Sequence, residues 1–438
     1  MQVLQRLYEK IKTLKSNPEI SSIISNTGWL MVERIVQLIT GVLISIWVTR
    51  YLGPERYGIY SYALSFSVIF TAFASFGIDS IVIRDLVKFE KKKNDLMGTA
   101  FAIKLIGGVL SLIVATIVLF FVNIEFETKI FVAIIVGSTI IKSFNVIDNF
   151  FQSRVESKFI VKTNTTALIL SHCIKIILVL TEGPLIGFVL ILLFDSTIRS
   201  LGYLFFYKKN NFLISEWKFN KKLAKSLLLE SWPLVLSGIA ISTAMRIDQI
   251  MLKSYLPANE LGFYAVGVRL AELFSFLPMM IGQSIYPKIV KLDFKANKKK
   301  ISQLIRYVFY FLCLMSLAVT LCANIGVDLL YGSKFISSTP VLQILIWTIP
   351  ITYLGIITNK LLMVQGHQKV IFIKQLALMI TNISFNLYFI PYHGIVGAAL
   401  ATLLADIVIN LFFDIIFNKA RWIFYIKMRA IFLIQYKK

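Results

Sequence analysis

Residues 97–121 read MGTAFAIKLIGGVLSLIVATIVLFF, and this stretch carries a single charged side chain, Lys104. As a helix it is long enough to cross a bilayer, because about 20 apolar residues span the ~30 Å hydrocarbon core. Similar runs recur along the 438 residues, 57% of which are hydrophobic. A soluble protein of this size and composition would have too little polar surface to cover its core. The sequence therefore predicts an all-α polytopic membrane protein.

Apolar runs between charged or turn-rich breaks define the membrane-spanning segments of the chain. They predict twelve transmembrane helices, with boundaries good to a few residues, at 27–49, 57–83, 97–121, 129–152, 163–181, 184–207, 229–251, 262–287, 301–323, 338–363, 368–390 and 394–417.

The charge of the chain is unevenly distributed. Lys plus Arg number 46 against 23 Asp plus Glu, which gives a net charge of +23. If the N-terminus lies inside, most cations between the spans fall in the two tails and the inner loops. The outer loops then hold only Arg50, Arg56, Lys129, Lys253 and Lys334. This asymmetry predicts cytoplasmic termini, and it explains the basic excess through topology and anionic lipid rather than through nucleic-acid binding.

The chain also repeats itself at a nearly constant spacing. At 204 residues, the loops after the first and seventh spans match in Tyr51 and Tyr255, Leu52 and Leu256, Gly58 and Gly262, and Tyr60 and Tyr264. At 211 residues, the sixth and twelfth spans match in Gly183 and Gly394, Leu192 and Leu403, Leu193 and Leu404, and Asp195 and Asp406. Because six is even, both halves enter the membrane in the same direction. We therefore expect two parallel six-helix repeats around a central cleft.

These features predict five parts in the chain. The two tails contain apolar residues at helical spacing with Lys or Arg between them, as is typical of helices at a membrane surface. The expected parts are an amphipathic N-tail (1–26), an N-terminal six-helix lobe (27–207), a cytoplasmic linker (208–228), a C-terminal six-helix lobe (229–417) and a basic interfacial C-tail (418–438).

Motifs for catalysis and metal binding are missing from the sequence. It has no G-x-x-x-x-G-K-[ST] loop for a nucleotide and no H-E-x-x-H metal motif, and its outer loops are too short to hold an enzyme's acceptor and donor. We therefore expect no catalytic residue, no metal site and no cofactor, with an ion gradient or the membrane potential as the energy source. The histidines are scattered and the cysteines are expected to pack in the core: His172, His367, His393, Cys173, Cys313 and Cys322.

Cations within the spans are the candidates for substrate binding, because an ionisable group in lipid costs several kcal/mol and is expected to face a polar interior. The four lysines among these cations have no acid within one turn on their own helix, and such unpaired cations favour an anionic cargo. Pairing across helices is the alternative explanation, since the spans hold eight acids as well. The eight candidates are Arg34, Lys104, Lys142, Lys175, Arg199, Arg246, Arg269 and Lys360.

Acids within the spans are the candidates for ion coupling. Asp195 lies four residues from Arg199 and Glu272 lies three from Arg269, so each pair is either structural or a ligand contact. Asp248 lies near the outer end of the seventh span and is expected to bind a coupling proton or sodium ion. Asp79, Asp148, Asp406 and Asp414 complete the acids; the coupling candidates are Glu33, Asp195, Asp248 and Glu272.

Three short stretches resemble one known family. TRYLGPERYGIY (49–60), after a span that begins NTGW (26–29), resembles the N-terminal signature of Wzx-type polysaccharide flippases. GIVGAALAT (394–402) and VQGHQK (364–369) resemble the start of the last span and the exit of the tenth in that family. The family belongs to the multidrug/oligosaccharidyl-lipid/polysaccharide exporter superfamily, so the resemblance implies a MATE-like fold. It also implies intramembrane cations in the cleft, and Arg34, Arg246 and Arg269 are similar in placement.

The function implied by this resemblance is flipping of an undecaprenyl-pyrophosphate-linked oligosaccharide, such as an O-antigen or capsule unit, by alternating access. The implied location is the bacterial inner membrane, in lipopolysaccharide or other polysaccharide biosynthesis. The partners would be membrane lipids and the polysaccharide polymerase and chain-length machinery. The equal numbers of cations and acids in the spans depart from a strongly cationic cleft.

Three other functions compete with this interpretation. A lipid II flippase of the same superfamily usually has fourteen spans, and a MATE-type exporter of cationic drugs would favour acids over unpaired lysines. A membrane glycosyltransferase or ligase is the alternative from another class, and the short outer loops argue against it. A structural scaffold would leave the charges within the spans unexplained.

Overall fold

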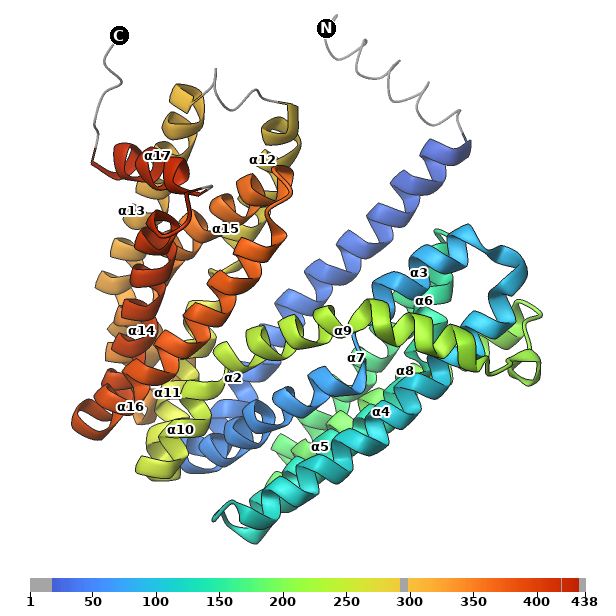
Figure 1. The fold of residues 1–438 in the computed structure, drawn as a ribbon. Helices are drawn as coiled ribbons and strands as arrows, with labels where there is room; N and C mark the ends of the chain where they lie inside the picture. The colour runs from blue at the N-terminus through green and yellow to red at the C-terminus, as the bar shows by residue number, and fades with distance from the viewer. Residues whose placement is uncertain (1–17, 292–297, 419, 433–438) are drawn as a thin grey trace, which may run out of the picture. The chain divides into compact units, whose positions relative to one another are not determined.

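A computed structural model describes residues 18–291, 298–418 and 420–432, and throughout these ranges the chain is helical or forms short connections, without a strand (Figure 1). The first 17 residues of the predicted amphipathic N-tail lie outside the described residues. Helix is the expected outcome for a chain in lipid, because a helix satisfies its backbone hydrogen bonds within one segment. The prediction of an all-α membrane protein is confirmed.

The helices fall into two compact units. Unit 1 contains the chain up to Tyr51 together with Ile69–Gly238, and unit 2 contains Leu52–Val68 together with the chain from Ile239 onward. Helix α2 (Pro18–Ala74) contributes to both. Unit 1 otherwise consists of α3 (Asp79–Lys88), α4 (Lys93–Phe121), α5 (Phe126–Ile141), α6 (Val146–Ser153), α7 (Ser157–Leu180), α8 (Leu185–Lys209) and most of α9 (Lys221–Ala244).

Unit 2 is built mainly from the second half of the chain. Its helices are α10 (Ile247–Tyr255), α11 (Ala258–Glu272), α12 (Phe276–Lys291), α13 (Lys298–Tyr331), α14 (Thr339–Leu345), α15 (Thr348–Val364), α16 (Gln368–Ile407) and α17 (Arg421–Ile431). A π-helical turn, Val408–Phe412, follows α16 directly. Such turns are frequent at functional sites, and this one comes two residues after Asp406.

Two of these helices are too long to be single spans. Helix α2 has 57 residues, so a straight helix would extend ~85 Å, more than twice the thickness of the hydrocarbon core. Its backbone breaks at Gly53, where φ is 70° and ψ is 174°, and Pro54 follows. Helix α16 breaks in the same way at Gly394, with φ 55°. Each helix is therefore interrupted at its glycine, close to the boundary between two predicted spans.

In the described part of the chain, nine helices are long and apolar enough to cross a membrane, or ten if the bent pair Lys221–Pro233 and Gly238–Ala244 forms one span. This number counts α2 as one helix and α16 as one helix with the turns that follow it. The exact number of twelve stays a prediction, although each of these two runs covers two of the predicted spans.

Several predicted spans are broken at their charged residues. Lys142 begins the 3₁₀ turn that separates α5 from α6, Arg246 is the N-cap of α10, and Glu272 ends α11. A broken helix exposes backbone donors and acceptors that an intact helix would use internally, which is how many transporters build polar sites at membrane depth. The breaks therefore indicate where polar chemistry is concentrated.

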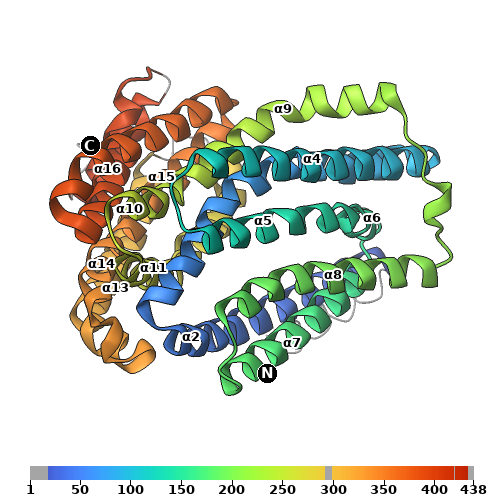
Figure 2. The ribbon, with the colours of Figure 1, turned by 90° about the horizontal axis from the view of Figure 1, so that it is seen from below.

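Within unit 1, helices α4 and α5 lie side by side, as do α7 and α8 (Figure 2). Gly108 allows the first of these close approaches, because a Cβ atom there would lie 3.0 Å from the backbone of Ile140. Small residues at helix contacts are typical of membrane bundles, where packing replaces the hydrophobic effect. An aromatic cluster fills one end of the unit, with Phe150, Phe151 and Tyr207 almost fully buried.

Within unit 2, two glycines related by the 204-residue repeat meet at one helix crossing. A Cβ atom on Gly58 would lie 1.8 Å from the carbonyl oxygen of Ala258, and one on Gly262 would lie 1.9 Å from that of Pro54. The residues that the two glycines contact are themselves related by the same repeat. The crossing is extended by Gln249, whose Oε1 accepts hydrogen bonds from Ser65 (2.6 Å) and Ser61 (3.1 Å). Neither glycine can be replaced without separating the helices.

The C-terminal helix α17 packs against α13 (Figure 1). The Arg306 guanidinium donates to the carbonyl of Arg429 at 2.8 Å. Lys427 is 1% exposed and pairs with Asp414, which also contacts Lys374 at 3.4 Å. Burial lowers the pKa of Lys427 to about 8, and the positive charge of Lys374 acts in the same direction. This basic residue of the predicted interfacial tail therefore serves as an internal anchor.

Candidate functional site

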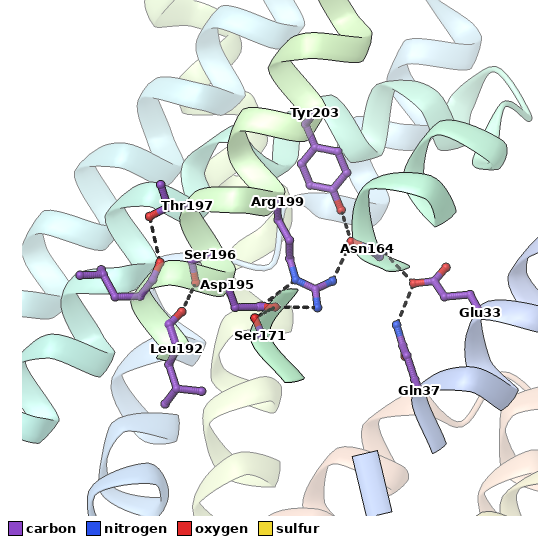
Figure 3. Close-up of polar contacts among 11 residues, drawn as sticks. Glu33, Gln37, Asn164, Ser171, Leu192, Asp195, Ser196, Thr197, Arg199 and Tyr203 are labelled. Carbon is purple, nitrogen blue, oxygen red and sulfur yellow. Dashed lines mark hydrogen bonds and ion pairs between the residues drawn. The ribbon is translucent and has the colours of Figure 1, made fainter. Parts of the chain in front are cut away.

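The polar interior of unit 1 is organised by one face of α8. Asp195, Arg199 and Tyr203 follow each other at intervals of four residues, so their side chains project from the same face of the helix. The Arg199 guanidinium donates to both carboxylate oxygens of Asp195, at 2.7 and 3.3 Å. It also donates to Oδ1 of Asn164 on α7 at 2.7 Å, so it fixes the contact between the two helices (Figure 3).

Asn164 continues this network to α2. It accepts a hydrogen bond from the Tyr203 hydroxyl at 2.9 Å and donates one to Glu33 at 2.9 Å. Glu33 also accepts from Gln37, one turn along α2, at 2.8 Å (Figure 3). On the other side of the arginine, the Ser171 hydroxyl donates to Asp195 at 3.2 Å. Polar side chains from α2, α7 and α8 thus form one continuous chain of contacts.

The unit 1 network pairs one of its two acids with a cation and holds the other with amides. It contains one cation, Arg199, and two acids, of which Asp195 is in ion-pair contact and Glu33 is 8% exposed and held by amides. The Arg199 and Asp195 side chains are about a quarter exposed, at 25% and 26%. A pair of this kind in lipid is stable only because each charge has several partners.

A second polar cluster of unit 1 involves Lys104. Its side chain is 7% exposed and pairs with Asp79, which also accepts a hydrogen bond from Asn149 at 2.7 Å. Lys104 and Asp79 border a cavity of about 130 Å³ that Lys142 also lines. Lys104 has no acid within one turn on its own helix, because its partner Asp79 lies on a different helix.

Unit 2 contains a cavity of about 240 Å³ with three carboxylates in its wall, those of Asp248, Glu272 and Asp406. Neutral polar groups accompany them, and the aliphatic side chains that complete the wall come from α9, α11, α14, α15 and α16. The polar neutral residues are Ser275, Thr348, Gln375, Asn382 and Thr402. Such a mixture of apolar wall and converging polar groups is typical of a binding site.

The three acids of this cavity differ in their partners. Glu272 pairs with Arg246 at 3.1 Å and with Arg269 at 4.0 Å, so the arginine on the neighbouring helix is the closer of the two. Asp248 is 6% exposed and accepts hydrogen bonds from the Tyr264 hydroxyl and from the backbone N–H of Gln249 (2.7 Å). The sequence-predicted pair of Arg269 with Glu272 is therefore the weaker contact of this carboxylate.

Asp406, the third acid, receives hydrogen bonds from uncharged donors. The amide of Asn410 donates to it at 3.0 Å, and the Thr352 hydroxyl donates at 3.4 Å. Beside it, Asn382 donates to Thr402 at 3.2 Å, and Asn386 donates to Asn382 at 3.0 Å. These oxygens could bind a proton or a small cation. Among the described residues, however, no group of three His, Cys, Asp or Glu side chains is arranged to hold a metal ion.

The remaining predicted residues are scattered. Arg34 is exposed, Lys142 is exposed beside the cavity that Lys104 borders, and Lys175 and Lys360 are half-buried. The structure therefore brings the candidate cations together only in part: Lys104 and Lys142 line one cavity of unit 1, and Arg246 and Arg269 both contact Glu272 in unit 2. The cysteine prediction was wrong, since Cys173 and Cys322 are exposed and Cys313 is half-buried. In a membrane protein, apolar runs face lipid as well as the core.

Three kinds of residue escaped the sequence analysis. The amides Asn164 and Gln37 carry no charge, although an amide within an apolar helix is itself a signal of buried polar contacts. Lys374 lies within the predicted span 368–390 but is not among the eight candidate cations, and its side chain is 1% exposed. Lys427 lies in the predicted C-tail and Asp414 is not among the coupling candidates, yet both are buried. For these residues, distance from the span centre was a poor guide to burial.

Comparisons with known proteins agree with this architecture. A family model described as polysaccharide biosynthesis protein matches residues 23–293. A capsular polysaccharide biosynthesis protein of Staphylococcus aureus, CapF, is 22% identical over 392 residues, which are 88% of this chain and 96% of the relative.

Two solved structures show the same fold. The lipid II flippase MurJ, in an inward closed conformation, has a TM-score of 0.72 at 14% identity, covering 94% of this chain and 91% of its own. An inward-facing multidrug resistance MATE family transporter of the MOP superfamily has a TM-score of 0.66 at 16% identity, covering 93% and 98%. The predicted MATE-like fold is confirmed, since both of these proteins, a transporter and a flippase, share it.

Proposed function

Because this chain belongs to the family of polysaccharide biosynthesis proteins, we propose that it is a flippase for an undecaprenyl-pyrophosphate-linked oligosaccharide. The cargo would pass from the cytoplasmic leaflet to the outer leaflet by alternating access, with its lipid tail in the bilayer. The relative from Staphylococcus aureus is named for capsular polysaccharide, so a capsule repeat unit is the first cargo to test. An O-antigen unit is the second.

The observation that carries this proposal is the set of ionisable side chains buried within the membrane-spanning helices of both units. Each would cost several kcal/mol in lipid, so a structural scaffold would gain nothing from keeping them. Arg199 in unit 1, and Arg246 and Arg269 in unit 2, are our principal candidates for contact with the pyrophosphate or with acidic sugars. Arginine suits this role because its planar fork binds phosphate and carboxylate in two-point contacts.

We propose that the energy comes from a proton or sodium gradient that acts on unit 2. Asp248 and Asp406 line the same cavity, and both accept hydrogen bonds from uncharged donors. A carboxylate in this setting gains stability when it binds a proton or a small cation. Binding there would change the charge of the cavity wall, which gives the two states of a transport cycle different energies.

The setting we propose is the cytoplasmic membrane of a bacterium, with both termini inside. The distribution of lysine and arginine between the spans supports this orientation. A polymerase and chain-length machinery that act on the outer face would receive the flipped units. The family name, which concerns polysaccharide biosynthesis, supports a role in such a pathway.

The experiment that tests the proposal is deletion of the gene followed by location of the lipid-linked oligosaccharide. A flippase deletion is expected to leave complete oligosaccharide on the cytoplasmic leaflet, where an enzyme or lectin added outside cannot reach it. Re-expression of the intact chain should restore access from outside. Loss of the oligosaccharide itself would instead indicate an enzyme that assembles it, and normal access from outside would contradict flipping by this chain.

A further inference from the structure

Unit 1 contains another cavity, of about 360 Å³, away from the Arg199 network. It lies where the end of α3, the start of α4, the end of α6 and the segment after α8 come together. The inner loops that the charge distribution places in the cytoplasm form these ends. Its wall includes Leu86, Glu90, Lys93, Phe150, Arg154 and Phe212.

Two cations in this wall are oriented by the same two aromatic rings. The Lys93 ammonium is 4.4 Å from the ring centre of Phe212. The Arg154 guanidinium carbon is 5.6 Å from the ring centres of both Phe150 and Phe212. The rings pack edge to face at 4.9 Å, and Phe150 is 2% exposed, so the platform is rigid. Contacts of this kind hold a cation in place without neutralising it.

Acids near the cavity compensate this charge only in part. Glu90 is the one acid of the wall, and Glu156 is 3.5 Å from the Nε of Arg154. Ammonium and guanidinium together carry eight N–H donors, more than these contacts can use. Exposed lysines on the adjoining loop, Lys91 and Lys92, add to the positive potential. The cavity therefore has the chemistry of an anion site.

The surroundings of the cavity indicate that its ligand belongs to the membrane. Several large apolar side chains at or next to the residues of the wall are exposed: Val87 (65%), Phe89 (43%) and Leu213 (48%). A pocket for a soluble anion would gain no affinity from apolar groups on its rim. The apolar rim would suit the acyl chains of a lipid, and the basic wall would suit its anionic headgroup.

We propose that this cavity binds the phosphate headgroup of a membrane lipid in the cytoplasmic leaflet, with Lys93 and Arg154 as the ligands of the phosphate. The acyl chains would lie against the exposed apolar rim. This assignment stands apart from the proposed function, since it would hold for any cargo.

The test is a titration of the full-length protein in detergent with phosphatidylglycerol, with phosphatidylcholine as the neutral reference. Lys93→Ala/Arg154→Ala is expected to weaken phosphatidylglycerol binding about tenfold or more, since it removes both cations that would contact the phosphate directly. The matched control, Lys91→Ala/Lys92→Ala, removes the same charge from the adjoining loop and is expected to change affinity by less than about twofold. Equal weakening in both variants would overturn the proposal, because general attraction would then explain it.

Two further measurements complete the test. If the double variant does not fold, Arg154→Ala alone serves, since that side chain is 41% exposed and its loss leaves no buried charge. Inorganic phosphate and undecaprenyl pyrophosphate are added as competitors to the intact protein. Displacement by undecaprenyl pyrophosphate at concentrations below those of phosphatidylglycerol would support the site and assign it to the cargo lipid. Displacement by inorganic phosphate at comparable concentration would overturn a lipid site.

Discussion

At corresponding positions, each unit has an acid and, four residues later, a hydrogen-bond donor to that acid. The donor is charged in unit 1 and neutral in unit 2. Asp195 and Asp406 are 211 residues apart, and at the same spacing Arg199 of unit 1 corresponds to Asn410 of unit 2. Both acids accept a hydrogen bond from the residue four positions later, from a guanidinium at 2.7 Å in unit 1 and from an amide at 3.0 Å in unit 2. The spacing is the same, but the donor is charged only in unit 1, and Asn410 lies in the π-helical turn whereas Arg199 lies within a regular α-helix.

The neighbours of the two acids follow the same pattern. Asn164 and Ser171, which belong to the unit 1 network, correspond at this spacing to Gln375 and Asn382, which line the unit 2 cavity. The comparison teaches that the two units keep a common polar framework but use it differently. Unit 1 pairs its acid with a cation on the same helix, whereas Asp406 of unit 2 accepts hydrogen bonds from neutral donors.

The largest expected effect comes from Asp406→Asn. The amide keeps the size of the side chain and the hydrogen-bonding capacity toward Thr352 and Asn410, but it cannot take up a proton or bind a cation. We expect transport to be abolished at normal protein abundance, measured by access to the oligosaccharide from outside. Asp195→Asn is the matched variant in unit 1 and should mainly lower stability. Full transport by Asp406→Asn would remove the coupling role from unit 2.

Arg246→Ala should follow closely in size. It removes the cation 3.1 Å from Glu272 and leaves that acid in the cavity wall, so we expect surface polysaccharide to be lost. Arg269→Ala should have a smaller effect, because its contact with Glu272 is 4.0 Å. Immunoblotting of surface polysaccharide, with protein abundance measured in parallel, checks both. Normal display in both variants would exclude these arginines from the transport path.

Arg199→Ala tests the stabilising role of unit 1. It leaves Asp195 without its cation and removes one of the two donors to Asn164 Oδ1, and we expect the free energy of unfolding to fall by about 2–4 kcal/mol. Thermal unfolding in detergent measures this loss. Thr197→Ala on the same helix is the control, because its hydroxyl bonds only to the carbonyl of Leu193 at 2.9 Å. If the two variants unfold at the same temperature, the network adds little to stability.

The smallest effect is expected from Arg199→Asn, which copies the unit 2 pair into unit 1. The amide can still donate to Asp195, so the loss in unfolding free energy should be only about 1–2 kcal/mol, less than for alanine. Cation binding is the sharper measurement: this variant should make unit 1 sensitive to sodium or pH in a thermal unfolding assay. A loss as large as that of alanine would show that the amide cannot replace the guanidinium here.

Length and hydrophobicity made the membrane fold predictable, because a helix in lipid must be apolar for about 20 residues. Contacts within one helix were equally predictable, and the Asp195–Arg199 pair followed directly from four-residue spacing. Partners on different helices could not be predicted in this way. Asp79 contacts Lys104 and Asn164 contacts Glu33 across helix pairs, and helix rotation in lipid leaves little trace in a sequence that is apolar on all sides. The amides Asn164 and Gln37 were missed for a second reason: they carry no charge, so the pattern of charged residues does not indicate them.

The crossing of Gly58 with Ala258 and of Gly262 with Pro54 has a consequence for ancestry. Each contact is the counterpart of the other under the internal repeat, which is the pattern that two identical subunits make across a two-fold axis. A six-helix ancestor that paired with a second copy of itself would have made this contact once, at a self-complementary surface. Gene fusion would then have turned a subunit interface into the interior of one chain. Since a side chain on either glycine would clash with the backbone of the other segment, the crossing constrains both positions.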